Sequence, residues 1–397
     1  MEPLAPTERS MWEKSPVEPT TKMLDDEINN KYTSREWRIV TETNREQLPN
    51  FFEALKRPGW MELRPFYQRR LRWDAARQSK LIESFIMNIP VPPLFVYEAD
   101  LAKYEVMDGQ QRITAIHDFY SNQLRLTGLE QWSELNNRTY SKLPSEIKKG
   151  IDRRAISYTV LLKESAETTE EQTLLRQLVF ERLNTGGIQL AKQEIRNCIY
   201  QGEFNSMLFD LATHPIFRAA WGLPLFSESE RTNPQNILLE STFYSKMTDV
   251  EVVLRFFALR HADHYQRGMQ GFLDLYMLRA RRFTQDDVSH LRDLFHQTIE
   301  LGHQIYEDLL FHPWNAKEAK WEASAQRAFF DAVMVGLSRN LQRGSRLAER
   351  RIAVIDATKK LFENYPDGTF TGRGNSKADV TERINLFDGM LRSVTGE

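Results

Sequence analysis

The chain has 397 residues, of which 41% are hydrophobic and 27% charged, values typical of a globular protein that can bury a core. Its 53 basic and 55 acidic side chains leave a formal charge of −2, which excludes a histone-like polycation, so any contact with nucleic acid must use a local basic patch. A single cysteine, Cys198, excludes a disulfide framework and a four-cysteine zinc site. No apolar stretch approaches the roughly 18 residues of a membrane span and no signal-peptide pattern is visible, so a cytoplasmic protein with no membrane partner is expected.

Residues 1–33 are predicted to form a flexible arm. Residues 1–30 contain four prolines, and their seven acids against Arg9, Lys14 and Lys22 give a net charge of −4. They hold few residues of the types that usually fill a core, so we expect no stable fold of their own. Such an arm becomes ordered only when it binds a partner.

Residues 34–202 mix strand-like and helix-like segments, which is typical of an α+β domain. Two short apolar runs, Leu94–Tyr97 and Tyr104–Met107, are separated by a turn and predict a β-hairpin. A helix over Gln110–Tyr120 follows directly, and Asp74 is a candidate N-cap for an earlier helix. Further strands are predicted at Trp37–Thr41, Met61–Tyr67 and Ser157–Leu162, and further helices at Arg45–Leu55, Leu174–Leu183 and Ala191–Tyr200.

Residues 203–397 are predicted to form an all-helical domain, because their apolar residues recur every three to four positions. Ser376 followed by Asp379 is a capping-box variant and predicts the start of the last helix. His261 and His264 lie three apart but lack an acidic partner in a known metal-ligand spacing. The other helices are predicted at Val250–Leu259, Phe272–Ala280, Asp286–Leu310, Glu322–Leu341 and Glu349–Tyr365.

The stretch with the most chemical information is Asp-Gly-Gln-Gln-Arg at residues 108–112, where a predicted strand ends and a helix begins. The start of a helix has unpaired N–H groups and a partial positive charge, and it therefore favours phosphate. Gly109 lets a ligand approach the backbone, and Arg112 offers a bidentate fork for phosphate oxygens. Asp108 is suited to hold a metal ion that bridges phosphates, or to orient an attacking water. An ordinary strand–turn–helix explains the same residues, and the motif alone does not decide between the two.

Two further clusters flank this motif. Between residues 60 and 80, six cations accompany two acids, and the interleaved aromatic residues are of types that stack on bases. The solvated face of an edge strand is the simpler explanation for such an isolated cluster. The second cluster ends a predicted helix in Thr-Gly-Gly, where Gly186 fits a C-cap while Asn184 and Thr185 present polar groups to a ligand.

Taken in order, these clusters resemble the DGQQR-motif family of ParB/sulfiredoxin-like domains (domain of unknown function 262), which includes the N-terminal half of GmrSD-type modification-dependent restriction enzymes. Two-domain relatives carry a C-terminal HNH-type nuclease, whereas this chain has no recognisable His-Asn-His constellation, so we do not expect an intrinsic nuclease. The resemblance covers about residues 62–200 and rests on Tyr67-Gln-Arg before Trp73, Leu81-Ile-Glu-Ser-Phe-Ile with Pro90-Val-Pro-Pro, Asp108-Gly-Gln-Gln-Arg, and Leu183-Asn-Thr-Gly-Gly.

The resemblance implies that residues 34–202 bind and hydrolyse a nucleotide, within a bacterial anti-phage defence or restriction-like system that acts with DNA or a partner effector. It implies an NTP of unspecified base with Mg²⁺, and a protein partner or homo-oligomer. Asp108, Gln111 and Arg112 are the implied catalytic residues, and Asp108 is also the candidate metal ligand. The implied nucleotide-binding residues are Gln68, Arg69, Gly109, Gln110, Arg112, Asn184 and Thr185.

Two other hypotheses stay open. In the first, the protein is a DNA-binding or nicking nuclease of the ParB-like class, in which Arg64, Arg70 and Arg72 grip DNA and Asp108 serves a metal. In the second, it is a non-enzymatic assembly subunit that nucleotide stabilises. Phosphate release, DNA breakage and nucleotide-dependent melting distinguish the three.

Overall fold

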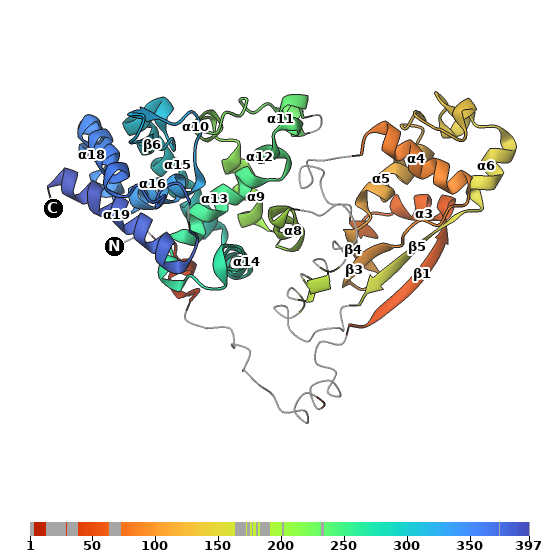
Figure 1. The fold of residues 1–397 in the computed structure, drawn as a ribbon. Helices are drawn as coiled ribbons and strands as arrows, with labels where there is room; N and C mark the ends of the chain where they lie inside the picture. The colour runs from red at the N-terminus through yellow and green to blue at the C-terminus, as the bar shows by residue number, and fades with distance from the viewer. Residues whose placement is uncertain are drawn as a thin grey trace. The chain divides into compact units, whose positions relative to one another are not determined.

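The chain divides into two compact units in the computed structural model (Figure 1). Pro19–Leu190 forms an α+β unit, and Met1–Glu18 joins Ala191–Glu397 in a helical unit. The predicted fold class, an α+β region followed by a helical one, is therefore confirmed. The structure describes residues 4–12, 29, 39–62, 73–162, 172, 175, 176, 178, 179, 182, 191–200, 202–231, 234–372 and 374–396.

The α+β unit is built on a five-stranded mixed sheet in the order β1-β5-β3-β4-β2. β3 and β4 form the predicted antiparallel hairpin, while β3 pairs in parallel with β5 and β4 in parallel with β2. In β5, Ile156, Tyr158 and Val160 are buried and alternate with more exposed residues, so one face of the strand points into a core. The strands are β1 (Thr41–Gln47), β2 (Met61–Glu62), β3 (Leu94–Asp100), β4 (Lys103–Asp108) and β5 (Ala155–Leu161).

Helices cover the buried face of this sheet (Figure 1). Asp74 caps α4 as predicted, because its carboxylate accepts a hydrogen bond from the Arg77 N–H at 2.7 Å. The helices are α3 (Leu48–Leu55), α4 (Ala75–Ile86), α5 (Gln110–Tyr120) and α6 (Ser145–Asp152). The core that they share with the sheet includes Leu48, Phe51, Ile82, Phe85, Leu94, Val96, Ile113, Ile116 and Phe119.

Two boundaries in this unit differ from the sequence prediction. β1 begins at Thr41, where the predicted strand ends, and continues to Gln47 through residues predicted as helix. α3 begins only at Leu48, because Pro49 has no N–H to donate and is tolerated only in the first turn of a helix. Of the segment predicted at Met61–Tyr67, residues 61–62 form the edge strand β2, and residues 63–67 lie outside the described part of the chain.

The helical unit packs around two helices whose residues are almost all buried, α13 (Thr248–Leu259) and α16 (Arg327–Arg339). Arg255 Nε donates to Asp331 Oδ1 at 2.9 Å, and Arg255 Nη2 donates to Asp331 Oδ2, so each charge has a partner inside the core. The other helices are α8 (Lys192–Ile199), α9 (Glu203–Ala212), α10 (Pro215–Ala220), α11 (Asn236–Glu240), α12 (Thr242–Ser245), α14 (Gly268–Ala280), α15 (Gln285–Tyr306), α17 (Gly344–Glu349), α18 (Arg351–Asn364) and α19 (Lys377–Thr395).

The predicted cap of the last helix is confirmed, whereas the start of α16 is not where it was expected. Ser376 and Asp379 cap α19 reciprocally: the Asp379 N–H donates to Ser376 Oγ at 3.3 Å, and the Ser376 N–H donates to Asp379 Oδ2 at 2.8 Å. The helix predicted from Glu322 begins at Arg327, because β7 (320–321) pairs instead with β6 (314–315) in a short hairpin. No helix in the described part of the chain is long and apolar enough to cross a lipid bilayer.

Helix α8 packs with the helical unit, although the sequence placed it in the first domain. The reason is Arg196, whose side chain is 1% exposed. Its guanidinium pairs with Glu251 at 2.9 Å and with Asp274 at 2.7 Å, so the side chain could not leave the unit without exposing three charges at once.

Residues 4–12 are also part of the helical unit and do not form the free arm that their composition predicted. They contain the short helix α1 (Pro6–Ser10), and Glu8 is 0% exposed. Glu8 Oε1 accepts hydrogen bonds from Arg260 Nη1 at 3.0 Å and from the Tyr276 hydroxyl at 2.9 Å. The Trp12 ring stacks on His264 with their centroids 4.9 Å apart. These partners lie more than 240 residues along the chain, so local composition could not indicate them.

Candidate functional site

Gly109 makes the turn that joins β4 to α5. Its φ of 101° lies in the left-handed region, which favours glycine. A Cβ at this position would also overlap Leu94 Cδ2, and Leu94 is itself 0% exposed on β3. The turn can therefore pass close to the hairpin only because residue 109 has no side chain.

The N-cap residue of α5 supplies no side chain to cap the first turn of the helix. Gly109 is the N-cap residue and has no side-chain acceptor to offer. The Ile113 N–H is the first to bond back along the helix, to the Gly109 carbonyl at 3.0 Å. α5 is 11 residues long, so its aligned peptide dipoles add a partial positive charge at this end. The start of α5 thus suits an anion.

Arg112 lies in the first turn of α5, and its guanidinium bonds to other groups of the protein. Nη2 donates to Asp108 Oδ2 at 2.6 Å, while Nη1 donates to the carbonyls of Pro93, at 3.1 Å, and Pro92. The Arg112 side chain is only 11% exposed. In this arrangement it joins the Asp-Gly turn to the Pro90-Val-Pro-Pro segment, rather than offering an open fork to a phosphate as the sequence had predicted.

Gln111 makes a second link between separate motifs. Its side chain is 9% exposed, and its Oε1 accepts a hydrogen bond from the Trp73 backbone N–H at 2.8 Å. Trp73 directly precedes the Asp74 cap of α4. The Gln110 side chain is half-buried at the first position of α5. Gln111 and Arg112 therefore hold Trp73 and the Pro90-Val-Pro-Pro segment in place next to the turn.

Asp108 is the one acid of the Asp-Gly-Gln-Gln-Arg motif, and solvent can reach its side chain. Its side chain is 41% exposed, and Oδ2 is occupied by Arg112. Oδ1 makes no hydrogen bond within the described part of the chain. Asp108 thus presents one carboxylate oxygen to solvent at the end of β4, beside the start of α5.

Two structural contacts near the motif were not predicted. Glu83 Oε1 accepts hydrogen bonds from the backbone N–H groups of Gln131 and Trp132, both at 2.9 Å. A charged residue within the apolar run Leu81-Ile-Glu-Ser-Phe-Ile was a signal for such a role. Glu105, on β4, pairs with Arg176, which lies in the segment predicted as a helix at residues 174–183. Nothing local in the sequence indicated that pair.

Several predicted site residues lie outside the described part of the chain, and the structure says nothing about them. They are Arg64, Gln68, Arg69, Arg70, Arg72, Asn184 and Thr185. Among the predicted site residues, the structure therefore brings together Asp108, Gly109, Gln110, Gln111 and Arg112.

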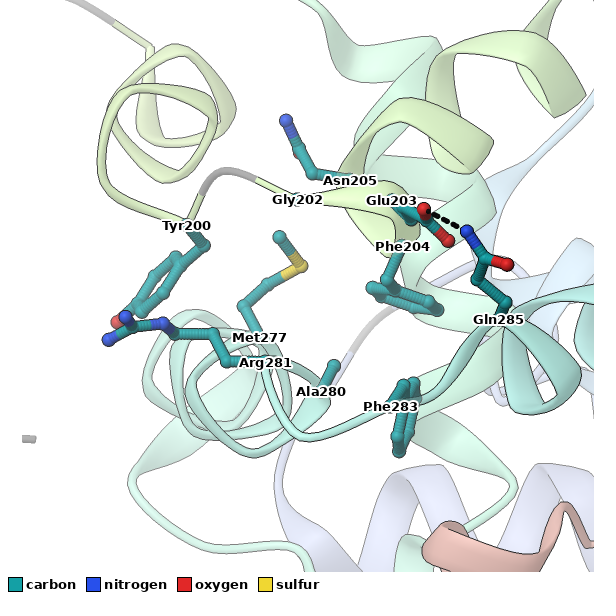
Figure 2. A pocket seen from close by; sticks show the side chains of 10 residues that line it. All are labelled: Tyr200, Gly202, Glu203, Phe204, Asn205, Met277, Ala280, Arg281, Phe283 and Gln285. Carbon is teal, nitrogen blue, oxygen red and sulfur yellow. Dashed lines mark hydrogen bonds between the residues drawn. The ribbon is translucent and has the colours of Figure 1, made fainter.

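The helical unit contains a separate hollow of about 250 Å³ (Figure 2). Figure 2 shows Tyr200, Met277 and Arg281 on one side of it, and Glu203 bonded to Gln285 on the other; that bond is 2.9 Å long. Of the predicted site residues that the structure describes, none lines this hollow. Across the described residues, no group of three or more His, Cys, Asp or Glu side chains is arranged to hold a metal ion.

Comparison with known proteins places the first unit in a family. A family model described as GmrSD restriction endonuclease, N-terminal domain, matches residues 27–201, which include the sheet, α5 and all the motifs discussed above. No curated protein and no solved structure matches the chain. The motifs quoted from the sequence lie inside the matched region and in the order that the resemblance required. Residues 27–201 therefore belong to the family of GmrSD restriction endonuclease N-terminal domains.

Proposed function

We propose that the α+β unit binds a nucleoside triphosphate with Mg²⁺ at the start of α5 and hydrolyses it, as a component of a restriction-like anti-phage system. One observation carries this proposal: the start of α5, formed by the left-handed Gly109 turn, lies beside the half-exposed carboxylate of Asp108. A helix start attracts phosphate, and a carboxylate next to it attracts the cation that accompanies a triphosphate.

The backbone is the phosphate-binding element in this proposal. The N–H groups at the start of α5 donate to phosphate oxygens in this proposal, and the left-handed Gly109 turn, packed against Leu94, sets where the helix begins. The base and sugar are recognised elsewhere, by residues such as Gln68, Arg69, Asn184 and Thr185 that the family resemblance implies. The base therefore stays open.

The residues present fit a Mg²⁺ ion that arrives with its nucleotide. Mg²⁺ is commonly bound by one or two carboxylates together with substrate phosphates and water, rather than by a cage of protein ligands. Asp108, whose Oδ2 is taken by Arg112, would supply one such ligand through Oδ1.

Hydrolysis needs a water molecule that attacks the γ-phosphorus while the bond to the β–γ bridging oxygen breaks. Asp108 can orient that water through its carboxylate. The N–H groups of α5 stabilise the charge that grows on the phosphate oxygens in the transition state. Arg112 and Gln111 act in this scheme as positioning residues, because their side chains hold Asp108, the proline segment and Trp73 rather than the nucleotide.

Replacing Arg112 with alanine should therefore weaken NTP binding at least about tenfold, because Asp108 and the carbonyls of Pro92 and Pro93 lose their common donor. Lysine at position 112 keeps the charge but cannot bridge three acceptors, so it should recover only part of the affinity. Calorimetric titration measures both variants. Arg125→Ala is the matched control, because Arg125 is exposed and donates to the Asn137 carbonyl away from the turn.

This experiment distinguishes a positioning role of Arg112 at the nucleotide site from a role in overall stability alone. A purely structural Arg112 would lower the melting temperature but leave the NTP affinity and its Mg²⁺ dependence unchanged in the folded fraction. Unchanged affinity in a folded Arg112→Ala variant would contradict the role that we assign to it.

The family relationship supports the wider context. A GmrSD-type domain points to a restriction-like or anti-phage defence system, and to DNA as a partner of that system. We extend this to a cytoplasmic protein whose nucleotide turnover is coupled to DNA or to a partner effector. The helical unit, which lies outside the matched residues apart from its start at 191–201, is the natural place for contact with such a partner.

Titration of the full chain with ATP, GTP, CTP and UTP, each with and without Mg²⁺, tests the binding step. We expect at least one NTP to bind, and to bind more tightly when Mg²⁺ is present. Binding without phosphate release would favour the assembly-subunit hypothesis. Metal-dependent breaks in plasmid DNA without NTP binding would favour the nicking hypothesis.

A further inference from the structure

A row of arginines lies along the last helix of the helical unit. α19 packs against α16 and α18 (Figure 1), and arginines from α16, α17 and their flanks reach over its C-terminal half. The five residues of this arginine ridge are Arg339, Arg343, Arg346, Arg350 and Arg392.

Hydrogen bonds anchor three of these arginines to α19. Arg339 Nη1 donates to Asn385 Oδ1 at 3.3 Å, and Arg350 Nη1 donates to the Val394 carbonyl at 2.7 Å. Arg346 Nη1 donates to the carbonyl of residue 395 at 3.4 Å. The anchor points on α19 thus run from residue 385 to residue 395, which corresponds to about 15 Å of helix.

The remaining two arginines lie between these ends. Arg392 pairs with Asp388 at 2.7 Å, and Arg343 donates to Asn340 Oδ1 at 2.8 Å. Asn340 in turn donates to Asp388 Oδ1 at 2.6 Å, so all five arginines are tied to the same stretch of α19.

The ridge keeps a positive charge. Its five arginines stand against Asp388, which is buried, and against Glu349 and Asp293, which are exposed, so five minus three leaves +2. Each of Arg346, Arg350 and Arg392 makes a single hydrogen bond within the described part of the chain, and a guanidinium has five donors. All three are exposed, so further donors are available to a ligand.

Small polar residues fill the surface between the arginines. The exposed positions of this half of α19 are Asn385, Gly389, Arg392, Ser393 and Gly396. A Cβ built at Gly389 would meet no atom within 4 Å, so the surface there is open. None of these residues is large and apolar, which disfavours insertion into a membrane. A polyanion with a regular backbone can lie along such a surface.

We propose that the arginine ridge binds the phosphate backbone of duplex DNA without reading its sequence. Phosphates on one strand are spaced about 3.4 Å apart along the axis, so about 15 Å of α19 spans about four of them. Arginine is well suited to phosphate because its planar fork donates two hydrogen bonds to one group. This inference adds a site to the proposed action on DNA, but it does not depend on NTP binding or hydrolysis.

The test is the affinity of the full chain for a labelled duplex of about 30 base pairs over a series of salt concentrations. In the triple variant Arg346→Gln, Arg350→Gln and Arg392→Gln, the slope of log affinity against log salt should become shallower by about three units. The affinity at low salt should fall about tenfold or more. Anisotropy measures both, and calorimetry on the same sample should show an unchanged NTP affinity.

A second variant avoids any change to the arginines. Gly389→Glu adds an acid to the middle of the ridge at a position where the new side chain meets no neighbour, so the fold should be preserved. It should weaken DNA binding. Gly150→Glu is the matched control, because Gly150 also lies in a helix, α6, with no atom within 4 Å of a Cβ. That variant should bind DNA as the unchanged chain does.

Two results would overturn the ridge assignment. One is DNA affinity and salt dependence that Gly389→Glu and the triple variant leave unchanged while both remain folded. The other is binding to anionic lipid vesicles that the ridge variants abolish, with no effect on DNA. If the wild-type chain shows no NTP turnover, that result would count against the proposed nucleotide site but not against the arginine ridge.

Discussion

Replacing Glu8 with glutamine should lower the free energy of unfolding of the helical unit by about 3 to 5 kcal/mol, the usual cost of removing one partner of a buried ion pair. Glu8 is 0% exposed, and its carboxylate holds Arg260 at 3.0 Å and His261 at 3.0 Å. Glutamine keeps the size of the side chain but removes the negative charge that faces Arg260. Urea unfolding of the full chain, followed by hydrogen exchange in α13 and α14, measures the loss.

The matched control is Glu53→Gln. Glu53 is 65% exposed and pairs with Lys56 on the surface of α3, where such pairs contribute little. We therefore expect a change below about 1 kcal/mol for this variant. A loss of the same small size for Glu8→Gln would show that residues 4–12 do not stabilise the helical unit.

Glu8 also predicts that the stability of the helical unit depends on pH. Burial by itself raises the pKa of Glu8, but Arg260 and His261 outweigh it and hold the pKa at about 2. The ionised form is thus favoured in the folded state, so this stabilisation is complete above the ordinary glutamate pKa of 4.5 and is lost as the pH falls toward 2. Unfolding measured across this pH range should show the loss of stability in the wild-type chain. The Glu8→Gln variant should not show it.

Local signals in the sequence were enough to predict the strand and helix that meet at the candidate site. Gly109 separates a short apolar strand from a run with helical period, so both the hairpin and the bounds of α5 could be predicted from neighbouring residues. The cap at Asp74 and the box at Ser376 are also local patterns. The family resemblance rested on motifs of the same kind, and the matched region confirms it.

Contacts between distant residues could not be predicted in this way. Arg112 looked like a free phosphate fork, but it bonds a proline carbonyl 20 residues earlier in the chain. Glu8 lies in a segment with the composition of a flexible arm, and its partner Arg260 is 252 residues away. Asp331 interrupts an apolar run at residues 328–337 of the sequence, yet it is the buried partner of Arg255. In each case the deciding energy is the pairing of a charge with a group that the local sequence does not contain.

Replacing Asp108 with asparagine should reduce NTP hydrolysis at least about 100-fold while changing NTP affinity much less. Asparagine still accepts the hydrogen bond from Arg112, so the turn should keep its shape. It removes the negative charge that we assign to the metal ion and the attacking water. Single-turnover measurements at saturating NTP separate the chemical step from binding.

Asp100→Asn is the matched control for that measurement. Asp100 is an exposed acid at the end of β3, where it pairs with Lys103 in the hairpin turn, so its substitution should leave hydrolysis unchanged. Equal hydrolysis by Asp108→Asn and the unchanged chain would remove Asp108 from the reaction.

The most direct test of the nucleotide site is phosphate release by the purified full chain with each of the four NTPs, with Mg²⁺ and with a chelator. The site that we propose at the start of α5 predicts saturable release with at least one NTP, its loss when Mg²⁺ is removed, and its loss in Asp108→Asn but not in Asp100→Asn. A folded chain that binds none of the four NTPs and releases no phosphate, with or without DNA, would contradict the account.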